Sequence, residues 1–202
     1  MSDYTVIAEV GETLIDLLKE NLDPSIQNSI ILTSPGEIES NDNIRLSLFL
    51  YQITENTYMK NQDMQLNDSL DPTRLSFPPL TLDLYYMLTS HPSTGIQDKT
   101  ERTKEEHSLL GRAIQIFNDS SILKGSALRG SLAENYEELH ITMTHLNLDD
   151  MTKVWTTFQD TPFRPSVCYL VTPIKIDSSR EKIVQRVVSK EVSSYYKEKE
   201  RK

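Results

Sequence analysis

Apolar and polar residues alternate most regularly in the stretch FPPLTLDLYYMLTSH, residues 77–91. In an extended chain one face of this stretch carries Leu80, Leu82, Leu84, Tyr86 and Leu88. The other face carries the residues between them, which are polar or mixed in character. A period of two predicts a β-strand. Pro-Pro before the strand and His-Pro after it predict where it ends.

Four further segments predict strands. SIILTSP (29–35) predicts a short strand, and residues 136–144 and 163–176 predict two others. The segment IRLSLFLYQITEN (44–56) carries apolar residues on both faces. This pattern is typical of a strand that is central in a sheet or covered on both sides.

Three segments have the 3.6-residue period of an amphipathic helix. Residues 3–20, with Ser2 or Asp3 as the expected cap, carry the stripe Val6, Ile7, Val10, Leu14, Leu17 and Leu18. Residues 101–118 carry the stripe Leu109, Leu110, Ala113, Ile114 and Phe117. The third helix, in DDMTKVWTTFQ, is expected to begin at Asn147 or Asp149.

The remaining segments show little hydrophobic periodicity. Residues 57–78 are polar and predict a long loop, and residues 120–131 predict a connector with Gly and Ser. The chain is thus predicted to contain about five strands and about three helices, which do not alternate as βαβ units. This predicts an α+β fold with a mixed or antiparallel sheet. We divide the chain into an α+β domain, 1–179, and a C-terminal basic arm, 180–202, which fits a helix or an extended segment.

The charge is unevenly distributed along the 202 residues. The arm has eight Lys and Arg against four Glu, a net charge of +4. Of the 21 basic and 30 acidic residues in the chain, 13 and 26 therefore lie before it, a net charge of −13. An acidic body disfavours nucleic acid as a partner, because contacts to phosphate dominate that affinity. A basic arm on an acidic body instead favours an acidic neighbour.

Composition limits the class of protein. The one cysteine, Cys168, excludes an intramolecular disulfide, and its apolar surroundings SVCYLVTPI predict a buried thiol in a protein made in a reducing cytosol. The N-terminus carries Asp3, Glu9 and Glu12 through its apolar part, so a signal peptide is not expected. The longest apolar run, LSLFLYQI, is far shorter than the roughly 18 residues that span a membrane.

No motif predicts catalysis or a cofactor. GSALRGS (125–131) has the glycine spacing of a phosphate-binding loop, but Ser131 and Leu132 stand where Lys and Ser or Thr are needed. His140 and His145 point to opposite faces of an extended strand, which disfavours a metal site. The acids of KEEH (104–107) lie in the first turns of a predicted helix and are expected to interact favourably with its dipole. We therefore expect no catalytic residue, no metal and no cofactor.

Six segments, in order, resemble one family: the tail terminator, or cap, proteins of phage-tail-like contractile injection systems, including the antifeeding prophage and the Photorhabdus virulence cassette. They are VIAEVGETLIDLL (6–18), IRLSLFLYQITEN (44–56), PPLTLDLYYMLTSH (78–91), EEHSLLGRAIQIFND (105–119), ILKGSALRGS (122–131) and VWTTFQDTPFRPSVCYLVTPIKIDS (154–178). Several members of that family carry a further C-terminal domain, so the resemblance is to their N-terminal domain.

The resemblance implies a structural protein of a phage tail-like particle, with no catalysis and no cofactor. Such α+β domains form a six-fold ring on the last layer of the inner tube and the contractile sheath, where the ring stops growth and anchors the sheath. The implied partners are further copies in a homohexamer, sheath and inner-tube subunits, and a second cap protein. The chain would be made in the bacterial cytoplasm and leave the cell within the particle, without membrane insertion.

We predict that the arm and the connector bind these partners. The predicted residues are Arg180, Ile183, Arg186, Val187, Val188, Val192, Tyr195, Tyr196, Lys124 and Arg129. Strand addition and an amphipathic helix in a groove both remain open for the arm. Two alternatives to a terminator remain: another structural subunit of the particle, such as a cap adaptor or baseplate part, and an unrelated ligand-binding domain or enzyme.

Overall fold

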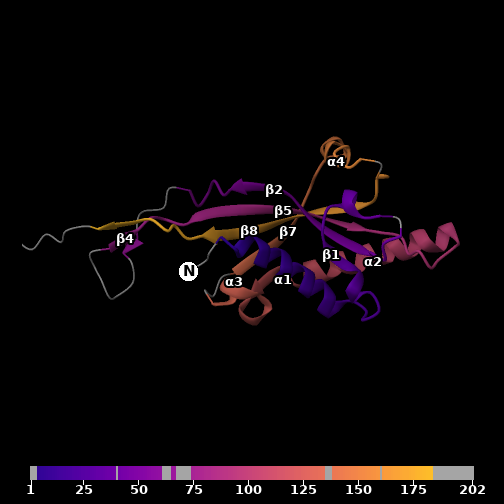
Figure 1. The fold of residues 1–202 in the computed structure, drawn as a ribbon, viewed down its shortest axis with the longest axis horizontal. Coiled ribbons are helices and arrows are strands. Elements are labelled where there is room, and N and C mark those ends of the chain that lie inside the picture. Colours follow the sequence, from indigo (N-terminus) through magenta and orange to yellow (C-terminus); the bar gives the residue numbers. More distant parts are fainter. Residues whose placement is uncertain are drawn as a thin grey trace, which may run out of the picture. The chain divides into compact units, whose positions relative to one another are not determined.

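The structure is a computed structural model, and it describes residues 4–39, 41–60, 65–66, 74–134, 138–159 and 161–183 (Figure 1). The chain forms two compact units, each built from two separate segments. The main unit contains Met1–Gln62 and Pro79–Asp177, and the second unit contains Asp63–Pro78 and Ser178–Lys202.

The main unit is built on a six-stranded sheet with the order β1-β2-β5-β8-β7-β6. β1 pairs parallel to β2, and the other neighbours pair antiparallel. The strands are β1 (Ile30–Leu32), β2 (Leu46–Glu55), β5 (Leu80–Ser90), β8 (Ser166–Ile176), β7 (Glu138–Thr144) and β6 (Ile122–Lys124). The predicted α+β class with a mixed sheet is therefore confirmed.

The predicted strand with the most regular alternation, β5, lies in the middle of this sheet. It pairs with β2 on one side and with β8 on the other. Its leucines at 82, 84 and 88 and Tyr86 face the main core, and Met87 faces a second, smaller cluster. The neighbouring β2 also serves both faces, as its pattern predicts. Leu46 and Leu48 lie in the main core, whereas Phe49 and Tyr51 pack on the smaller cluster.

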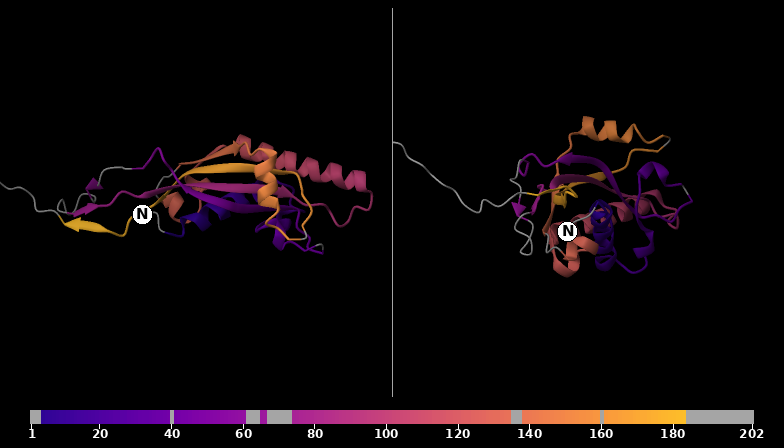
Figure 2. Two further views of the ribbon diagram at one scale, coloured as in Figure 1. Left: turned by 90° about the horizontal axis from the view of Figure 1, so that it is seen from above. Right: turned by 60° about the vertical axis from the view of Figure 1, so that its left-hand side comes forward.

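Four helices cover the two faces of the sheet unequally. α1 (Val6–Asn21), α2 (Lys99–Asp119) and α3 (Gly130–Glu134) lie on one face, and α4 (Leu148–Trp155) lies on the other (Figures 1 and 2). Short 3-10 helices occupy Gln27–Ser29, Pro35–Glu37 and Gly125–Ala127. None of the described helices is long and apolar enough to cross a membrane.

Helix caps explain where two of these helices begin. The Asp98 side chain accepts a hydrogen bond of 2.8 Å from the Glu101 N–H at the start of α2. The Asn147 side chain does the same for the Asp150 N–H at the start of α4, so of the two predicted starts Asn147 is correct. At α1 the N-cap position is Thr5, without a side-chain cap, and the expected caps Ser2 and Asp3 lie outside the described residues.

Two segments without period contain more structure than predicted. The connector 120–131 includes β6, a 3-10 turn and the start of α3. Gly125 and Gly130 turn the chain there with φ of +56° and +53°, a region that favours glycine. The long loop 57–78 includes β3 (Gln65–Leu66) and β4 (Arg74–Ser76). Strands of two or three residues are too short to produce a readable alternation.

The second unit is a three-stranded sheet with the order β3-β4-β9, antiparallel throughout. β9 (Glu181–Ile183) is the first part of the predicted arm, so at these residues the arm is extended. The rest of the arm, 184–202, lies outside the described residues.

Candidate assembly surfaces

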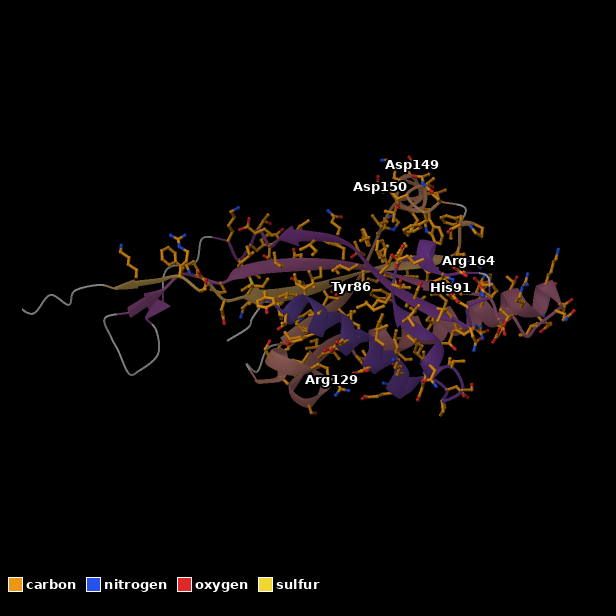
Figure 3. The ribbon with its side chains drawn as sticks, viewed as in Figure 1. Tyr86, His91, Arg129, Asp149, Asp150 and Arg164 are labelled. Atoms are coloured by element: carbon orange, nitrogen blue, oxygen red, sulfur yellow. The ribbon has the colours of Figure 1, made fainter. Side chains whose placement is uncertain are left out.

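Lys124 and Arg129, two of the residues predicted to bind a partner, form ion pairs within the main unit. Lys124 Nζ lies 2.6 Å from Glu138 Oε1 and joins β6 to β7. Arg129 Nε lies 2.8 Å from Asp16 Oδ2, and its Nη2 lies 3.9 Å from Glu20 Oε1, both on α1 (Figure 3). Both basic side chains are about half exposed. Their role toward a partner stays a prediction.

Two residues of the predicted arm lie in the second unit. The Arg180 guanidinium carbon lies 4.4 Å from the centre of the Phe77 ring, and the Phe77 N–H donates to the Arg180 carbonyl oxygen at 3.3 Å. Ile183 pairs with Arg74 across β4 and β9. The other predicted arm residues lie outside the described part of the chain: Arg186, Val187, Val188, Val192, Tyr195 and Tyr196.

A buried polar cluster lies where β2 begins and β5 ends. The antiparallel register brings Arg45 beside His91, and the His91 N–H donates to the Arg45 carbonyl oxygen at 2.9 Å. Arg45 Nε donates to the His91 carbonyl oxygen at 3.1 Å, and Arg45 Nη1 lies 2.8 Å from Glu105 Oε1 on α2. His91 Nε2 lies 2.8 Å from Ser47 Oγ. The cluster therefore ties α2 to two central strands.

A polar cavity adjoins this cluster. Its volume is about 410 Å³, and its wall includes the neutral His91 and residues of both charge signs: Glu39, Asp42, Arg102, Glu106 and Arg164. Arg164 Nη1 lies 3.4 Å from Glu106 Oε1, and Glu106 is only 8% exposed. His91 and Arg164 lie close together at this end of the sheet (Figure 3).

The cluster keeps His91 uncharged near neutral pH. Burial, together with the positive charges of Arg164 and Arg45, lowers the pKa of His91 to about 4. Bringing a proton to a buried imidazole between two guanidinium groups is unfavourable. Depending on its tautomer, the neutral ring either accepts a hydrogen bond from the Ser47 hydroxyl or donates one to it.

The pair of Ser47 and His91 has the contact of a nucleophile and its base, but its surroundings do not suit catalysis. Ser47 is completely buried, so a substrate cannot reach its hydroxyl. A histidine whose pKa is about 4 is also a weak base. No group of His, Cys, Asp or Glu within the described residues could hold a metal ion. The arrangement is that of a structural network.

The face that carries α4 exposes large apolar side chains. Leu148 at the start of α4 is 71% exposed, and Phe163, whose ring lies 5.3 Å from the Trp155 ring, is 55% exposed. A groove of about 290 Å³ beside α4 is lined by Met143, Leu146, Met151 and Cys168 among others. Exposed apolar side chains around a groove are typical of a protein contact.

Sequence reasoning missed the polar cluster. Glu105 and Glu106 are not in the first turn of their helix, because α2 already begins at Lys99. They instead meet Arg45 and Arg164, which are 60 and 58 residues away in sequence. One signal in the sequence was available: a charged residue, Arg45, lies directly before the apolar run of β2, where it would need a partner once buried.

Comparison with known families gives a match over most of the chain. The family model described as the Pvc16 N-terminal domain matches residues 9–190. No curated protein sequence matches.

Two solved structures share the fold. The sheath/tube terminator of the PVC, an extracellular contractile injection system, in its extended state, matches with a TM-score of 0.65 and 14% identity. The tube terminating cap of the anti-feeding prophage matches with a TM-score of 0.62 and 16% identity. The two matches cover 98% and 92% of this chain, which spans 66% and 60% of those chains. At such identities the likeness establishes the fold alone.

Proposed function

The chain belongs to the Pvc16 N-terminal domain family, and on that premise we propose that it is a structural cap, or tail terminator, of a phage-tail-like contractile injection system. Copies of the chain form a ring, a homohexamer, on the distal end of the inner tube and the sheath. The ring ends the growth of the tail and anchors the last layer of the sheath.

The observation that carries this proposal is that sequence family and fold point to the same kind of protein. The family match spans residues 9–190, and the two similar folds are a sheath/tube terminator and a tube terminating cap. Because the chain spans only 66% and 60% of those proteins, its partners are part of the proposal.

The two edges of the main sheet support a ring. A closed ring of identical subunits uses head-to-tail contacts, so each subunit needs two different surfaces. The sheet ends in β1 on one side and in β6 on the other. Each edge strand has three residues and one large apolar side chain that is about half exposed, Leu32 on β1 and Ile122 on β6.

The proposed partners are sheath and inner-tube subunits, with a second cap protein above the ring. The predicted domain 1–179 forms the ring, and the basic arm 180–202 reaches a neighbouring subunit, since an acidic body attracts a basic segment. The chain is made in the bacterial cytoplasm and built into the particle. Catalysis has no part in this function, which agrees with the buried position of Ser47.

Deletion of the gene from a host that makes such particles tests the function. We expect tails of uncontrolled length, or tails that lose their sheath at one end, and restoration by the full chain carrying a tag. Gold labelling of the tag should mark the end opposite the baseplate. Tails of unchanged length and structure after deletion would contradict the proposal, and labelling at the baseplate would favour the alternative of a baseplate part.

A further inference from the structure

A groove lies between α1 and the edge strand β1. It has a volume of about 330 Å³ and is lined by Glu12, Ile15, Asp16 and Lys19 of α1 and by Ile30–Leu32 of β1. Its floor is apolar, because Ile15 and Ile30 belong to the main core. Leu32 packs against α1 at Gly11, where an added Cβ would lie 2.7 Å from Leu32 Cδ2. Leu32 is nevertheless 46% exposed.

The backbone of β1 is open along this groove. β1 pairs with β2 alone among the described strands. The Ser29 carbonyl accepts from the Arg45 N–H at 2.8 Å, and the Thr33 N–H donates to the Leu48 carbonyl at 3.0 Å. Because backbone groups alternate in direction along a strand, those of Ile30 and Leu32 point away from β2. They form an edge to which another strand can be added.

The charge of the groove indicates what would bind there. Glu12 is exposed and forms no ion pair with any described residue, and Asp16 already binds Arg129. Lys19 is the single basic residue in the wall of the groove. A fitting segment would therefore be extended, with an apolar side chain to contact Leu32 and a basic side chain to pair with Glu12.

The distal part of the arm has this pattern in its sequence. From 184 onward it carries six Lys and Arg against three Glu, a net charge of +3. In an extended chain one face would present Val184, Arg186, Val188, Lys190 and Val192, in which apolar and basic residues alternate. We propose that this segment of a second copy of the chain adds as a strand to β1 and lies in the α1–β1 groove.

A second copy is the occupant that closes a ring. If each subunit offers its arm to the groove of the next, every copy carries both a donor and an acceptor, and the contact is head-to-tail. The 19 residues from 184 to 202 span up to about 60 Å when extended. This inference rests on the proposed function, because it presupposes that copies of the chain meet in a ring.

Disulfide trapping in assembled particles tests the contact. The variant would carry both Glu12→Cys and Val188→Cys, and the native Cys168, 2% exposed, stays out of reach. After mild oxidation of purified particles, we expect a ladder of covalent multimers up to the full ring on a non-reducing gel. Peptide mapping should show a disulfide that joins positions 12 and 188. A matched control pairs Val188→Cys with Lys104→Cys, on an exposed side chain of α2, and should give no ladder.

The other outcomes are distinct. A disulfide between positions 12 and 188 of the same chain would overturn the exchange between copies, because the arm would then fill its own groove. Intact particles that contain the variant but give no such bond would overturn the groove as the docking site and leave the capping function standing. Absence of the wild-type chain from particles would overturn the capping function and this inference together.

Discussion

The two faces of the main sheet are covered to different extents. On one face α1, α2 and α3 bury a continuous apolar core that reaches from Val6 to Ile174. On the other face the eight residues of α4 cover a cluster with three fully buried side chains, Met87, Trp155 and Cys168. The helix-rich face therefore buries the larger core, whereas the α4 face buries a small cluster.

The two faces should therefore contribute differently to the stability of the fold. Hydrophobic stabilisation grows with the apolar area removed from water, so the helix-rich face should carry most of the free energy of folding. The α4 face keeps Leu148 and Phe163 more than half exposed.

The largest expected effect is the difference in stability between alanine variants of two leucines on β5. Leu84→Ala empties a site in the main core that is 0% exposed, and it should lower the free energy of unfolding by about 3 kcal/mol. Leu80→Ala removes a side chain that is 46% exposed, and it should cost less than about 1 kcal/mol. Urea unfolding monitored by circular dichroism measures both. Equal losses of stability in the two variants would contradict the expectation that the loss follows the burial of the leucine side chain.

The α4 face should respond more weakly and more locally. Trp155→Ala should cost about 2 kcal/mol, less than a tryptophan in the main core, because the cluster around it is small and can relax. It should also expose Cys168, so we expect labelling of this thiol under native conditions to become at least about tenfold faster. Mass spectrometry follows the labelling.

Leu84→Ala is the control for that local effect. If α4 opens on its own, this variant should change the labelling rate of Cys168 much less than Trp155→Ala does, although it destabilises the whole domain more. Faster labelling in proportion to the global loss of stability would show instead that α4 and the main core open together.

Acid should weaken the cluster that fixes α2 on the helix-rich face. The pKa of His91, about 4 in the folded chain, lies below the usual value of 6.5, so as the pH falls the unfolded chain takes up this proton first. This contribution is complete above pH 6.5 and is lost as the pH falls toward 4. Between pH 8 and pH 5.5 we expect a loss of about 1 kcal/mol.

His91→Gln is the matched variant for the acid effect, because glutamine can still bond to Ser47 but does not titrate. Urea unfolding at pH 8 and pH 5.5 gives the difference for both chains. The wild type should lose about 1 kcal/mol more than the variant over this range. An equal loss in the two chains would remove His91 as the cause.

The sequence predicts the elements that bury a regular pattern and misses those fixed by distant pairing. β5 and α1 have clear periods, and Asn147 marks the start of α4 by its capping chemistry. The sheet β3-β4-β9 has strands of two or three residues, which leave no period to read. The polar cluster depends on the ion pair of Arg45 and Glu105, and hydrophobic periodicity near either residue does not predict this pair.

A further effect concerns how α3 is joined to α1 on the helix-rich face. Glu9 Oε2 accepts from the Ser131 N–H at 3.0 Å and from its hydroxyl at 2.8 Å, and a Cβ at Gly130 would lie 2.5 Å from Glu9 Oε1. Gly130→Ala should therefore displace this carboxylate in addition to straining a φ of +53°.

Gly125→Ala isolates the backbone term, because Gly125 has a similar φ of +56° and nothing lies within 4 Å of its added Cβ. We expect a loss of about 1 kcal/mol for Gly125→Ala and about 2 kcal/mol for Gly130→Ala, measured by urea unfolding. In a Glu9→Ala background the two substitutions should cost the same, because the displaced carboxylate is gone. If the difference persists there, the contact with Glu9 does not cause it.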